Sequence, residues 1–529
     1  MNKTFIDAKI SLNYIIGGII VLLMVGCQFK TDTRAVDLVT PNILIIMCDQ
    51  LNPKALGCYG GPVTTPNIDK LASEGVIFNN AVCPYPVCSP SRASIYLGKY
   101  PHEHGIAHNV MKIDYPAIPS PETEEGISDA DTTVIKLLHQ QGYETHHYGK
   151  WHLTEEPVSY LPDHFHEHHQ YAIEMRRVFN SVSQLPREKW MWWYGWALPV
   201  IVSPAYTDAL ASASREFLDG YYSEFVTKIG RLDLPIETNF DVRVTDKTVE
   251  ALNNTGREPF FIVGSFNYPH DPNVVPSPYY EMYDPDNIEL PVNYNSRDPF
   301  FEEDWGRIVV DNIGEEGVRE FLRIYYASVH LIDDQVGRIL EALEDTGKKD
   351  NTIVVFTADH GDMMAKQGMI WKSTRAFYND IMKVPLIISF PAKLKPDRTN
   401  VPINLADLAP TLLSLTNQEI PPSMTGIDYS EFLLDTENVT PPQEYVLCER
   451  IQSNQEHTRD RMNAGPGSFA IMSASWKYIR YPDDHEFLYH LSEDPEEMNN
   501  LAENDTYADK LKEMRMALKD KLKETNFTN

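Results

Sequence analysis

The sequence predicts an α/β fold: an open, mostly parallel central sheet flanked by helices, with a smaller C-terminal α+β part that holds an antiparallel sheet. Apolar runs that end abruptly in polar residues alternate with amphipathic helical segments, which is the pattern of a parallel sheet. After residue 440 the pattern changes to alternating polar and apolar residues. The chain has 529 residues, of which 42% are apolar, enough for one large domain and a smaller one.

The elements of the main sheet follow in order. Four apolar runs are predicted to be strands: "TPNILIIMCDQ", the segment that runs into Gly149, "PFFIVGSF" and "NTIVVFTADHG". A short helix is expected in "TPNIDKLASEG", with Gly75 suited to cap it, and another in the segment with Val134, Leu137 and Leu138 on one face. "YYASVHLIDDQVGRILEALEDTG" predicts a longer amphipathic helix.

Two regions depart from this alternation. Residues from about 155 to 250 contain "DHFHEHHQY" and "EKWMWWYGWALP", and we expect them to be an insertion at one end of the sheet. Residues 441–529 are expected to form a C-terminal subdomain. There "SFAIMSASWKYIRYPDDHEFLYHL" alternates as antiparallel strands do, and "TYADKLKEMRMALKDKLKE" is an amphipathic helix. The main domain is therefore expected at 38–440.

The N-terminus has the layout of a targeting segment. Lys3 and Lys9 precede the apolar run "YIIGGIIVLLMVG", which is too short to span a bilayer comfortably. The run ends in "MVGC", which resembles a bacterial lipobox. We therefore expect a signal peptide at 1–26, lipidation of Cys27 and a tether at 27–37; a plain signal peptide or an uncleaved anchor is the alternative. The expected protein is an exported bacterial lipoprotein, periplasmic or at the outer membrane or cell surface, held to the membrane by its lipid.

The charge balance and the number of cysteines restrict the classes of partner and the fate of one cysteine. The 46 Lys and Arg residues against 76 Asp and Glu give a formal net charge of -30, which argues against nucleic-acid binding. Any site for an anionic substrate must therefore be a local basic pocket. Of six cysteines, five remain once Cys27 is set aside, and an odd number in an exported chain indicates that one has a separate fate. The pairing of the other four stays open: Cys48, Cys58, Cys83 and Cys448.

Polar side chains follow two of the predicted strands directly. Asp49 and Gln50 end the first, and Asp359 and His360 end the last. The carboxyl ends of parallel strands meet at one edge of a sheet, where ligands bind, so these side chains are expected to converge. A single Asp after a strand is usually a turn former or a helix cap. Two such pairs favour a site for one divalent cation with mostly oxygen ligands.

Basic residues are expected around this site. A lone lysine is usually a solvated surface residue, but Lys150 and His152 gain weight because "GKWHL" directly follows a strand. Several cations beside a metal in so acidic a chain indicate a tetrahedral oxyanion as the substrate. The candidates are Arg92, Lys99, Lys150, His152, His270 and Lys372.

"CSPSRASIYLGKYPHEHGI" resembles the signature of the type I, formylglycine-dependent sulfatases of the alkaline phosphatase superfamily: C-x-P-S-R followed by a G-[KR]-Y-P-x-x-H-G-like element. "NILIIMCDQL", "GYETHHYGKWHL", "SFNYPHDP" and "VVFTADHGDMMAKQGMIWKS" match further blocks in the expected order. The resemblance covers essentially the whole chain after the lipobox. Several blocks in order are far more specific than a lone C-x-P-S-R. The resemblance implies an alkaline-phosphatase-like sheet, with the sulfatase catalytic domain at 38–440.

The resemblance also implies the nucleophile. Cys88 would be oxidised to formylglycine by a dedicated maturase that reads Pro90 and Arg92, and Arg92 would then steady the aldehyde hydrate. In this family one hydroxyl of the hydrate, activated by the metal, attacks sulfur and expels the alcohol. The other hydroxyl then loses its proton, and collapse to the aldehyde ejects sulfate.

The remaining roles follow from the same resemblance. Lys150 and Lys372 would bind sulfate oxygens, His152 would assist at the nucleophile, and His270 would protonate the leaving alcohol, as suits an imidazole. The metal would be held by Asp49, Gln50, Asp359 and His360, together with the residue at 88.

Two positions depart from the common sulfatase pattern. Many members carry Asp where this chain has Gln50, and Asn where it has His360. A nitrogen ligand shifts preference from calcium towards manganese; Ca²⁺ is expected on family grounds, with Mn²⁺ or Mg²⁺ as alternatives. The same pairing resembles the phosphonate monoester and phosphodiester hydrolases of the superfamily, which stay an alternative function.

The expected substrate is a sulfated glycan or oligosaccharide. The aromatic cluster "KWMWWYGW" could be core packing or a platform for sugar rings, and "HFHEHHQ" is expected to be a solvated loop rather than a second metal site. A surface glycan-binding lipoprotein without catalysis is a further alternative, and it predicts an unmodified Cys88 or loss of the lysines. Every proposed catalytic position carries a competent residue, which favours the enzyme.

Overall fold

The computed structural model describes residues 40–110, 126–153, 159–161, 163–166, 185, 190–193, 196–218, 228–373, 375–451 and 467–527. Pro41–Asn529 forms one compact unit. The predicted signal peptide, tether and Cys27 lie outside the described residues. Within the described part, none of the helices is long and apolar enough to cross a membrane.

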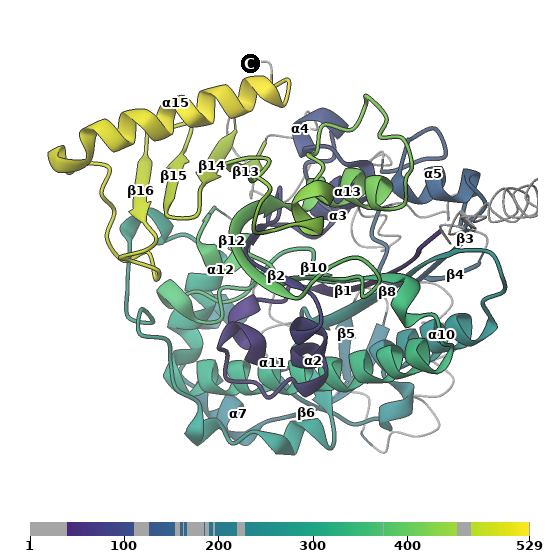
Figure 1. Cartoon of the computed structure of the whole chain (residues 1–529). Coiled ribbons are helices and arrows are strands. Elements are labelled where there is room, and N and C mark those ends of the chain that lie inside the picture. The colour runs from purple at the N-terminus through teal and green to yellow at the C-terminus, as the bar shows by residue number, and fades with distance from the viewer. Residues whose placement is uncertain are drawn as a thin grey trace, which may run out of the picture. The chain divides into compact units, whose positions relative to one another are not determined.

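The main sheet has eight strands in the order β12-β2-β11-β10-β1-β8-β3-β4 (Figure 1). Along the described chain, β11 is antiparallel to both of its neighbours and the other pairs are parallel. The prediction of a mostly parallel sheet is confirmed. The strands are β1 Asn42–Asp49, β2 Val76–Val82, β3 Glu144–Gly149, β4 Asp163–His166, β8 Phe260–Pro269, β10 Thr352–Ala358, β11 Leu386–Ser389 and β12 Asp397–Asn404.

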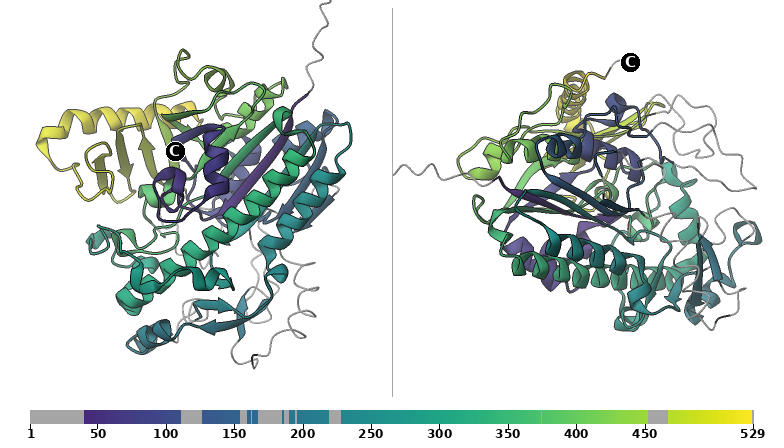
Figure 2. Two further views of the ribbon diagram at one scale, coloured as in Figure 1. Left: turned by 60° about the horizontal axis from the view of Figure 1, so that its bottom comes forward. Right: turned by 90° about the vertical axis from the view of Figure 1, so that its right-hand side faces the viewer.

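Helices cover both faces of this sheet (Figures 1 and 2). On one face lie α2 (Pro66–Ser73), α10 (Phe240–Asn254) and α11 (Trp305–Asp345). On the other lie α3 (Cys88–Leu97), α4 (Pro101–His104), α5 (Val134–Gln140) and α13 (Leu408–Leu415). Because both faces are covered, β1 and β10 are buried along their whole length, which explains their continuous apolar runs.

Two helix boundaries differ from the expectation. The helix predicted from Tyr325 is the C-terminal part of α11, which begins at Trp305 and is interrupted at Gly314, where φ is 62° and ψ is -172°. Glycine adopts this conformation at little steric cost, so the helix breaks there. Gly75 does not cap α2, which ends on Glu74. A Cβ at Gly75 would lie 2.8 Å from the carbonyl oxygen of Ile388, so this glycine permits close approach to β11.

The C-terminal residues form the antiparallel sheet that the alternating pattern predicted. Its strands are β13 Val446–Arg450, β14 Ser468–Met472, β15 Trp476–Arg480 and β16 Glu486–His490, in sequential order. The helix α15 (Ala508–Glu524) lies across this sheet (Figure 1). Its Met514 and Leu518 belong to the same buried cluster as Phe469 and Tyr478 of the strands.

A second four-stranded sheet has the order β5-β6-β7-β9. It comprises β5 Trp190–Trp193, β6 Trp196–Val202, β7 Gly230–Leu232 and β9 Val274–Pro276. The region predicted as an insertion contributes the first three strands, together with α7 (Pro204–Leu210) and α8 (Arg215–Leu218). Most of "DHFHEHHQY" lies outside the described residues. Among the described residues, the chain also forms the short α-helices α12 (Asn379–Met382) and α14 (Ser430–Leu434).

Candidate active site

Cys88 is the first residue of α3 and is completely buried. Val87 before it is extended, with φ -149° and ψ 147°, so the chain turns into the helix at the cysteine. Two serines of "CSPSR" fasten this turn. The Ser89 hydroxyl donates to the carbonyl of His152 at 2.6 Å, and the Ser91 hydroxyl donates to the carbonyl of Asp359 at 2.5 Å. Sequence patterns alone predict no role for these serines, because their partners are distant in the chain.

The strand-end side chains converge beside Cys88. Asp49, Cys88, Asp359 and His360 are buried, and each offers one ligand atom within 4.8 Å of the others. His360 Nε2 lies 3.3 Å from Cys88 Sγ and 3.6 Å from Asp49 Oδ1. The cause is topological, because β1 and β10 are adjacent parallel strands that end at the same edge. Two carboxylates and an imidazole form a donor set for a divalent cation.

Gln50 completes this set. Its backbone adopts φ 63°, its N–H donates to Asp359 Oδ1 at 3.1 Å, and its side-chain Nε2 donates to Asp362 Oδ2 at 2.6 Å. The side-chain Oε1 is buried and has no hydrogen-bond partner among the described residues. Buried carbonyl oxygens are normally satisfied. A buried oxygen without a hydrogen-bond partner, next to the Asp49 and Asp359 carboxylates, suits a metal ligand, so the residues fit a metal.

Asp362 is a functional candidate that sequence reasoning missed. It is fully buried, accepts the Gln50 amide on one oxygen, and accepts the N–H of Met364 on the other at 2.7 Å. Burial raises its pKa to about 6, against the lowering effect of these two hydrogen bonds. The available signal was its place in "TADHGDMM", three residues after Asp359. Its side chain orients Gln50 so that the oxygen, rather than the amide nitrogen, is left free.

Arg92 contacts a proposed metal ligand. Its Nε donates to Asp359 Oδ2 at 2.7 Å, and both side chains are completely buried. Its Nη1 donates to the carbonyl of Lys150 at 2.7 Å and to the Ser265 hydroxyl at 2.8 Å. These contacts place this guanidinium on Asp359, on the backbone carbonyl of Lys150 and on Ser265. It neutralises one carboxylate and holds the loop that carries the lysine.

Two lysines approach the sulfur of Cys88. Lys372 Nζ lies 3.3 Å from Cys88 Sγ, and Lys150 Nζ lies 3.6 Å from it while also contacting the Asp49 carboxylate. His270 Nε2 is 2.8 Å from Lys372 Nζ, and its Nδ1 is 3.1 Å from the carboxylate of Asp271. Lysines and histidine come from three separate loops, yet they meet at the start of α3.

The electrostatics favour negative charge at position 88. Burial by itself would raise the pKa of the Cys88 thiol, but Lys150, Lys372 and His360, with a hydrogen bond from His152, lower that pKa well below its usual value. Burial also disfavours the charged form of His270, yet the Asp271 and Asp49 carboxylates raise its pKa.

Not every predicted basic residue joins the site. Lys99 follows the C-terminal end of α3, whereas Cys88 begins this ten-residue helix. A ten-residue helix is about 15 Å long, which separates the two positions. Together with burial, the charge of Lys99 lowers the pKa of His104 instead. The side chains of the "KWMWWYGW" tryptophans lie outside the described part of the structure; their backbone forms β5 and the start of β6.

The comparisons agree with this geometry. The sulfatase family model matches residues 41–418, and the model of the N-sulphoglucosamine sulphohydrolase C-terminal region matches 368–525. An ulvan-active sulfatase of Formosa agariphila is 28% identical over 541 residues, which cover 99% of this chain and 89% of that protein. An N-acetylglucosamine-6-O-sulfatase of Bacteroides thetaiotaomicron is 26% identical over 539 residues, covering 92% and 86%.

A solved phosphonate monoester hydrolase of Agrobacterium radiobacter has a TM-score of 0.72 at 21% identity, covering 92% of this chain and 96% of that one. At this identity the likeness shows the fold alone. The family model covers more than half of the chain, so the chain belongs to the sulfatase family. It is a sulfuric ester hydrolase of the alkaline phosphatase superfamily, and membership implies a divalent metal and a formylglycine.

Proposed function

We propose that this protein removes a sulfate group from a sulfated saccharide, with residue 88 acting as formylglycine. The observation that carries the proposal is the convergence of Lys150, Lys372 and His360 on Cys88 Sγ, at 3.6, 3.3 and 3.3 Å. The cysteine side chain marks where the hydrated aldehyde would stand. The saccharide is supported by two relatives, the ulvan-active sulfatase and the N-acetylglucosamine-6-O-sulfatase.

The lysines hold the sulfate oxygens in this proposal. Both ammonium groups lie beside position 88 in a buried site, where a charge-assisted hydrogen bond is stronger than in water. Lys150 is itself held against Asp49, and its backbone carbonyl accepts from Arg92. Its position is therefore fixed before substrate arrives, which is the condition for stabilising charge without reorganisation.

His270 is the proposed general acid. Its Nε2 lies beside Lys372 and therefore on the substrate side, while its Nδ1 contacts Asp271. The raised pKa favours the protonated imidazole, whose proton can be given to the leaving alcohol. His152 hydrogen-bonds the side chain at 88 and is assigned to the proton of the nucleophile.

Asp49, Gln50, Asp359 and His360 would hold the metal, for which we propose Ca²⁺, with Mn²⁺ or Mg²⁺ as the alternatives in a metal-replacement assay. When bound, the ion supplies Lewis-acid activation of a hydroxyl at position 88. Arg92 holds Asp359 and Asp362 holds Gln50, so the donor set is oriented by the chain itself.

Maturation and export complete the proposal. All ten residues of α3 are buried, including Pro90 and Arg92, so a maturase that reads these residues has to act before the chain folds.

We propose lipidation at Cys27 and export to the periplasm or the cell surface on the strength of "MVGC". Replacement of Cys27 by serine should then move the protein from the membrane fraction to the soluble fraction; retention on membranes would contradict the anchor.

The test combines chemistry at residue 88 with turnover. Protein from a host that has the maturase is digested, and the mass of the peptide that contains residue 88 is measured by mass spectrometry. For the same protein, kcat/KM is measured on an aryl sulfate, a phosphonate monoester and a phosphodiester. Cys88→Ala should abolish hydrolysis, and Cys58→Ser, at a partly exposed thiol, should not. An intact thiol at residue 88 in active enzyme would contradict the assignment of formylglycine as the nucleophile. A higher kcat/KM on the phosphonate would transfer the function to that alternative.

A further inference from the structure

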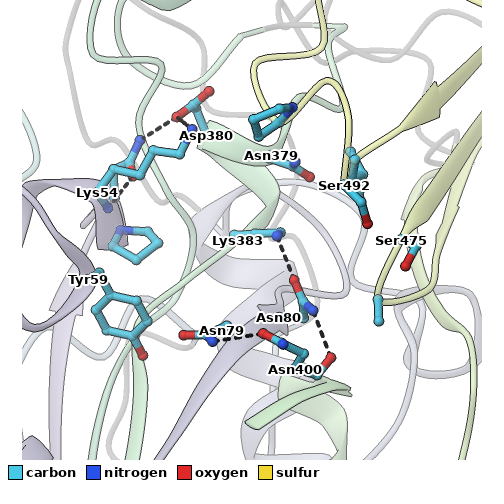
Figure 3. Close-up of a pocket in the computed structure, with 15 residues that line it drawn as sticks. Lys54, Tyr59, Asn79, Asn80, Asn379, Asp380, Lys383, Asn400, Ser475 and Ser492 are labelled. Atoms are coloured by element: carbon cyan, nitrogen blue, oxygen red, sulfur yellow. Dashed lines mark hydrogen bonds and ion pairs between the residues drawn. The ribbon is translucent and has the colours of Figure 1, made fainter. Parts of the chain in front are cut away.

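A cavity of about 430 Å³ lies between the edge of the main sheet and the loops of the C-terminal sheet. Figure 3 shows Lys54 and Tyr59 on one side, Ser475 and Ser492 on the other, and Lys383 between them. None of the residues assigned to the metal, to sulfate or to proton transfer lines it. Its volume is within the range of small-molecule sites.

The walls are rich in amides and hydroxyls. Asn79 and Asn80 of β2 lie beside Asn400 of β12 and are ordered by mutual hydrogen bonds: Asn79 Nδ2 donates to Asn400 Oδ1 at 2.8 Å, and Asn80 Nδ2 donates to the Asn400 carbonyl at 2.7 Å (Figure 3). A primary amide offers two donors and two acceptor lone pairs, so each of these groups keeps capacity for a ligand. Fixed amides of this kind match a polyhydroxylated ring rather than an apolar molecule.

Lys383 gives the cavity a cation that forms no ion pair among the described residues. Its Nζ donates to Asn80 Oδ1 at 2.6 Å, and no carboxylate of the described residues lies within ion-pair distance of it. Burial, together with the charge of Lys477, lowers its pKa to about 8, while the carboxylates of Glu497 and Asp380 act in the opposite direction. Its one hydrogen-bond partner among the described residues is a neutral amide, so the ammonium can take an oxyanion as a further, charged partner.

The acidic residue of the cavity does not oppose an anion. Asp380 is 3.4 Å from Lys366 Nζ and 3.9 Å from Lys54 Nζ, and its carboxylate also accepts the Asn52 amide at 3.1 Å. Lys54 is further paired with Glu496 at 2.8 Å. Asp380 is thus already neutralised, which disfavours a metal cation here. In a chain of formal net charge -30, a lysine in a concave site with no ion pair among the described residues is a specific feature.

We propose that this cavity is a second, non-catalytic binding site for a saccharide that carries a single oxyanion, with Lys383 taking the anion and Asn79 and Asn80 taking ring hydroxyls. Serines from the C-terminal loops close the opposite wall, so a bound ring would bridge the main sheet and the C-terminal sheet. The inference goes beyond hydrolysis, because none of the lining groups touches position 88.

The test measures binding where turnover cannot interfere. In a Lys372→Ala background, calorimetry is run with glucosamine 6-O-sulfate, glucosamine and inorganic sulfate. Adding Lys383→Met should weaken binding of the sulfated sugar at least tenfold. Lys395→Met, at an exposed lysine outside the cavity, is the matched control and should leave it unchanged. Asn79→Ala is a second, partly exposed position that should weaken the same ligand if Lys383→Met does not fold.

The three ligands distinguish a sulfated sugar from free sulfate. The variants distinguish binding in this cavity from catalysis at position 88. Equal affinity for glucosamine, or an equally tight Lys383-dependent affinity for inorganic sulfate, would overturn the assignment of an anionic saccharide. So would an absence of binding or an equal effect of Lys395→Met. Lys383→Met alone should keep kcat/KM on a small aryl sulfate within twofold, whereas a large loss would place Lys383 in catalysis. Failure of the catalytic proposal would show instead as an inactive wild-type protein that still binds the sugar here.

Discussion

Replacing Asp362 by Asn tests whether Gln50 is a metal ligand. The two oxygens of Asp362 are both used, one by Gln50 Nε2 at 2.6 Å and one by the N–H of Met364 at 2.7 Å. Asparagine has the same shape but only one oxygen, so one of the two donors must face an NH₂ group. Either Gln50 loses the partner that fixes its amide, or the turn at Met364 loses its anchor.

The magnitude follows from the kind of contact. Groups that orient a metal ligand typically change metal affinity 10–100-fold when replaced, which is about 1.4–2.7 kcal/mol. We expect Asp362→Asn to weaken Ca²⁺ binding by this amount in a competition titration against a fluorescent chelator. Turnover should fall at limiting metal and recover in part at saturating metal, because the ligand is misoriented rather than removed.

A matched control separates this effect from general destabilisation. Asp333 of α11 is another buried aspartate in a network of short hydrogen bonds, with the Ile68 N–H at 2.8 Å and Asn67 Nδ2 at 2.9 Å. Asp333→Asn should lower the midpoint of thermal unfolding without changing metal affinity. The reasoning is refuted if Asp362→Asn binds Ca²⁺ within twofold of the parent, or if both variants lose affinity equally.

Three further outcomes are expected. Lys372→Ala should lower kcat/KM on an aryl sulfate by about 10²–10³-fold with an unchanged circular dichroism spectrum, since one oxyanion donor is removed; near-normal rates would reject its sulfate role. His270→Ala should damage hydrolysis of sugar sulfates, which have poor leaving groups, by about 10²–10⁴-fold and that of activated aryl sulfates much less; equal losses would argue against a general acid. Burial and nearby Lys99 lower the pKa of His104 to about 3, below the usual histidine value, so its stabilising contribution is complete above pH 6.5 and is lost as pH falls. Denaturant titration should show that the free energy of unfolding falls by up to about 2 kcal/mol by pH 5, and that it depends less on pH in His104→Gln. The same pH dependence in both proteins would contradict the assignment.

The sequence predicted the sheet better than its surroundings. Continuous apolar runs such as that of β1 are specific to strands buried on both faces, and their polar ends located Asp49 and Asp359 at one edge. Gly75 was misassigned because its constraint is the carbonyl of Ile388, more than three hundred residues away. Asp362, Ser89 and Ser91 were missed for the same reason: their partners become neighbours only in the folded chain.

Asp359 connects residues from the end of β1, from α3 and from its own loop into one hydrogen-bonded unit. Its Oδ1 accepts the backbone N–H groups of Gln50 and His360 at 3.1 and 2.9 Å, its Oδ2 accepts Arg92 at 2.7 Å, and its carbonyl accepts Ser91. Gln50, His360 and the helix that begins with Cys88 are therefore all held by one residue. A contact shared in this way couples its members energetically, so losses from pairs of substitutions should not add. It also explains why Arg92 tolerates complete burial: its charge is matched by the carboxylate that the proposed metal also needs, so the cation and the metal site depend on each other for their stability.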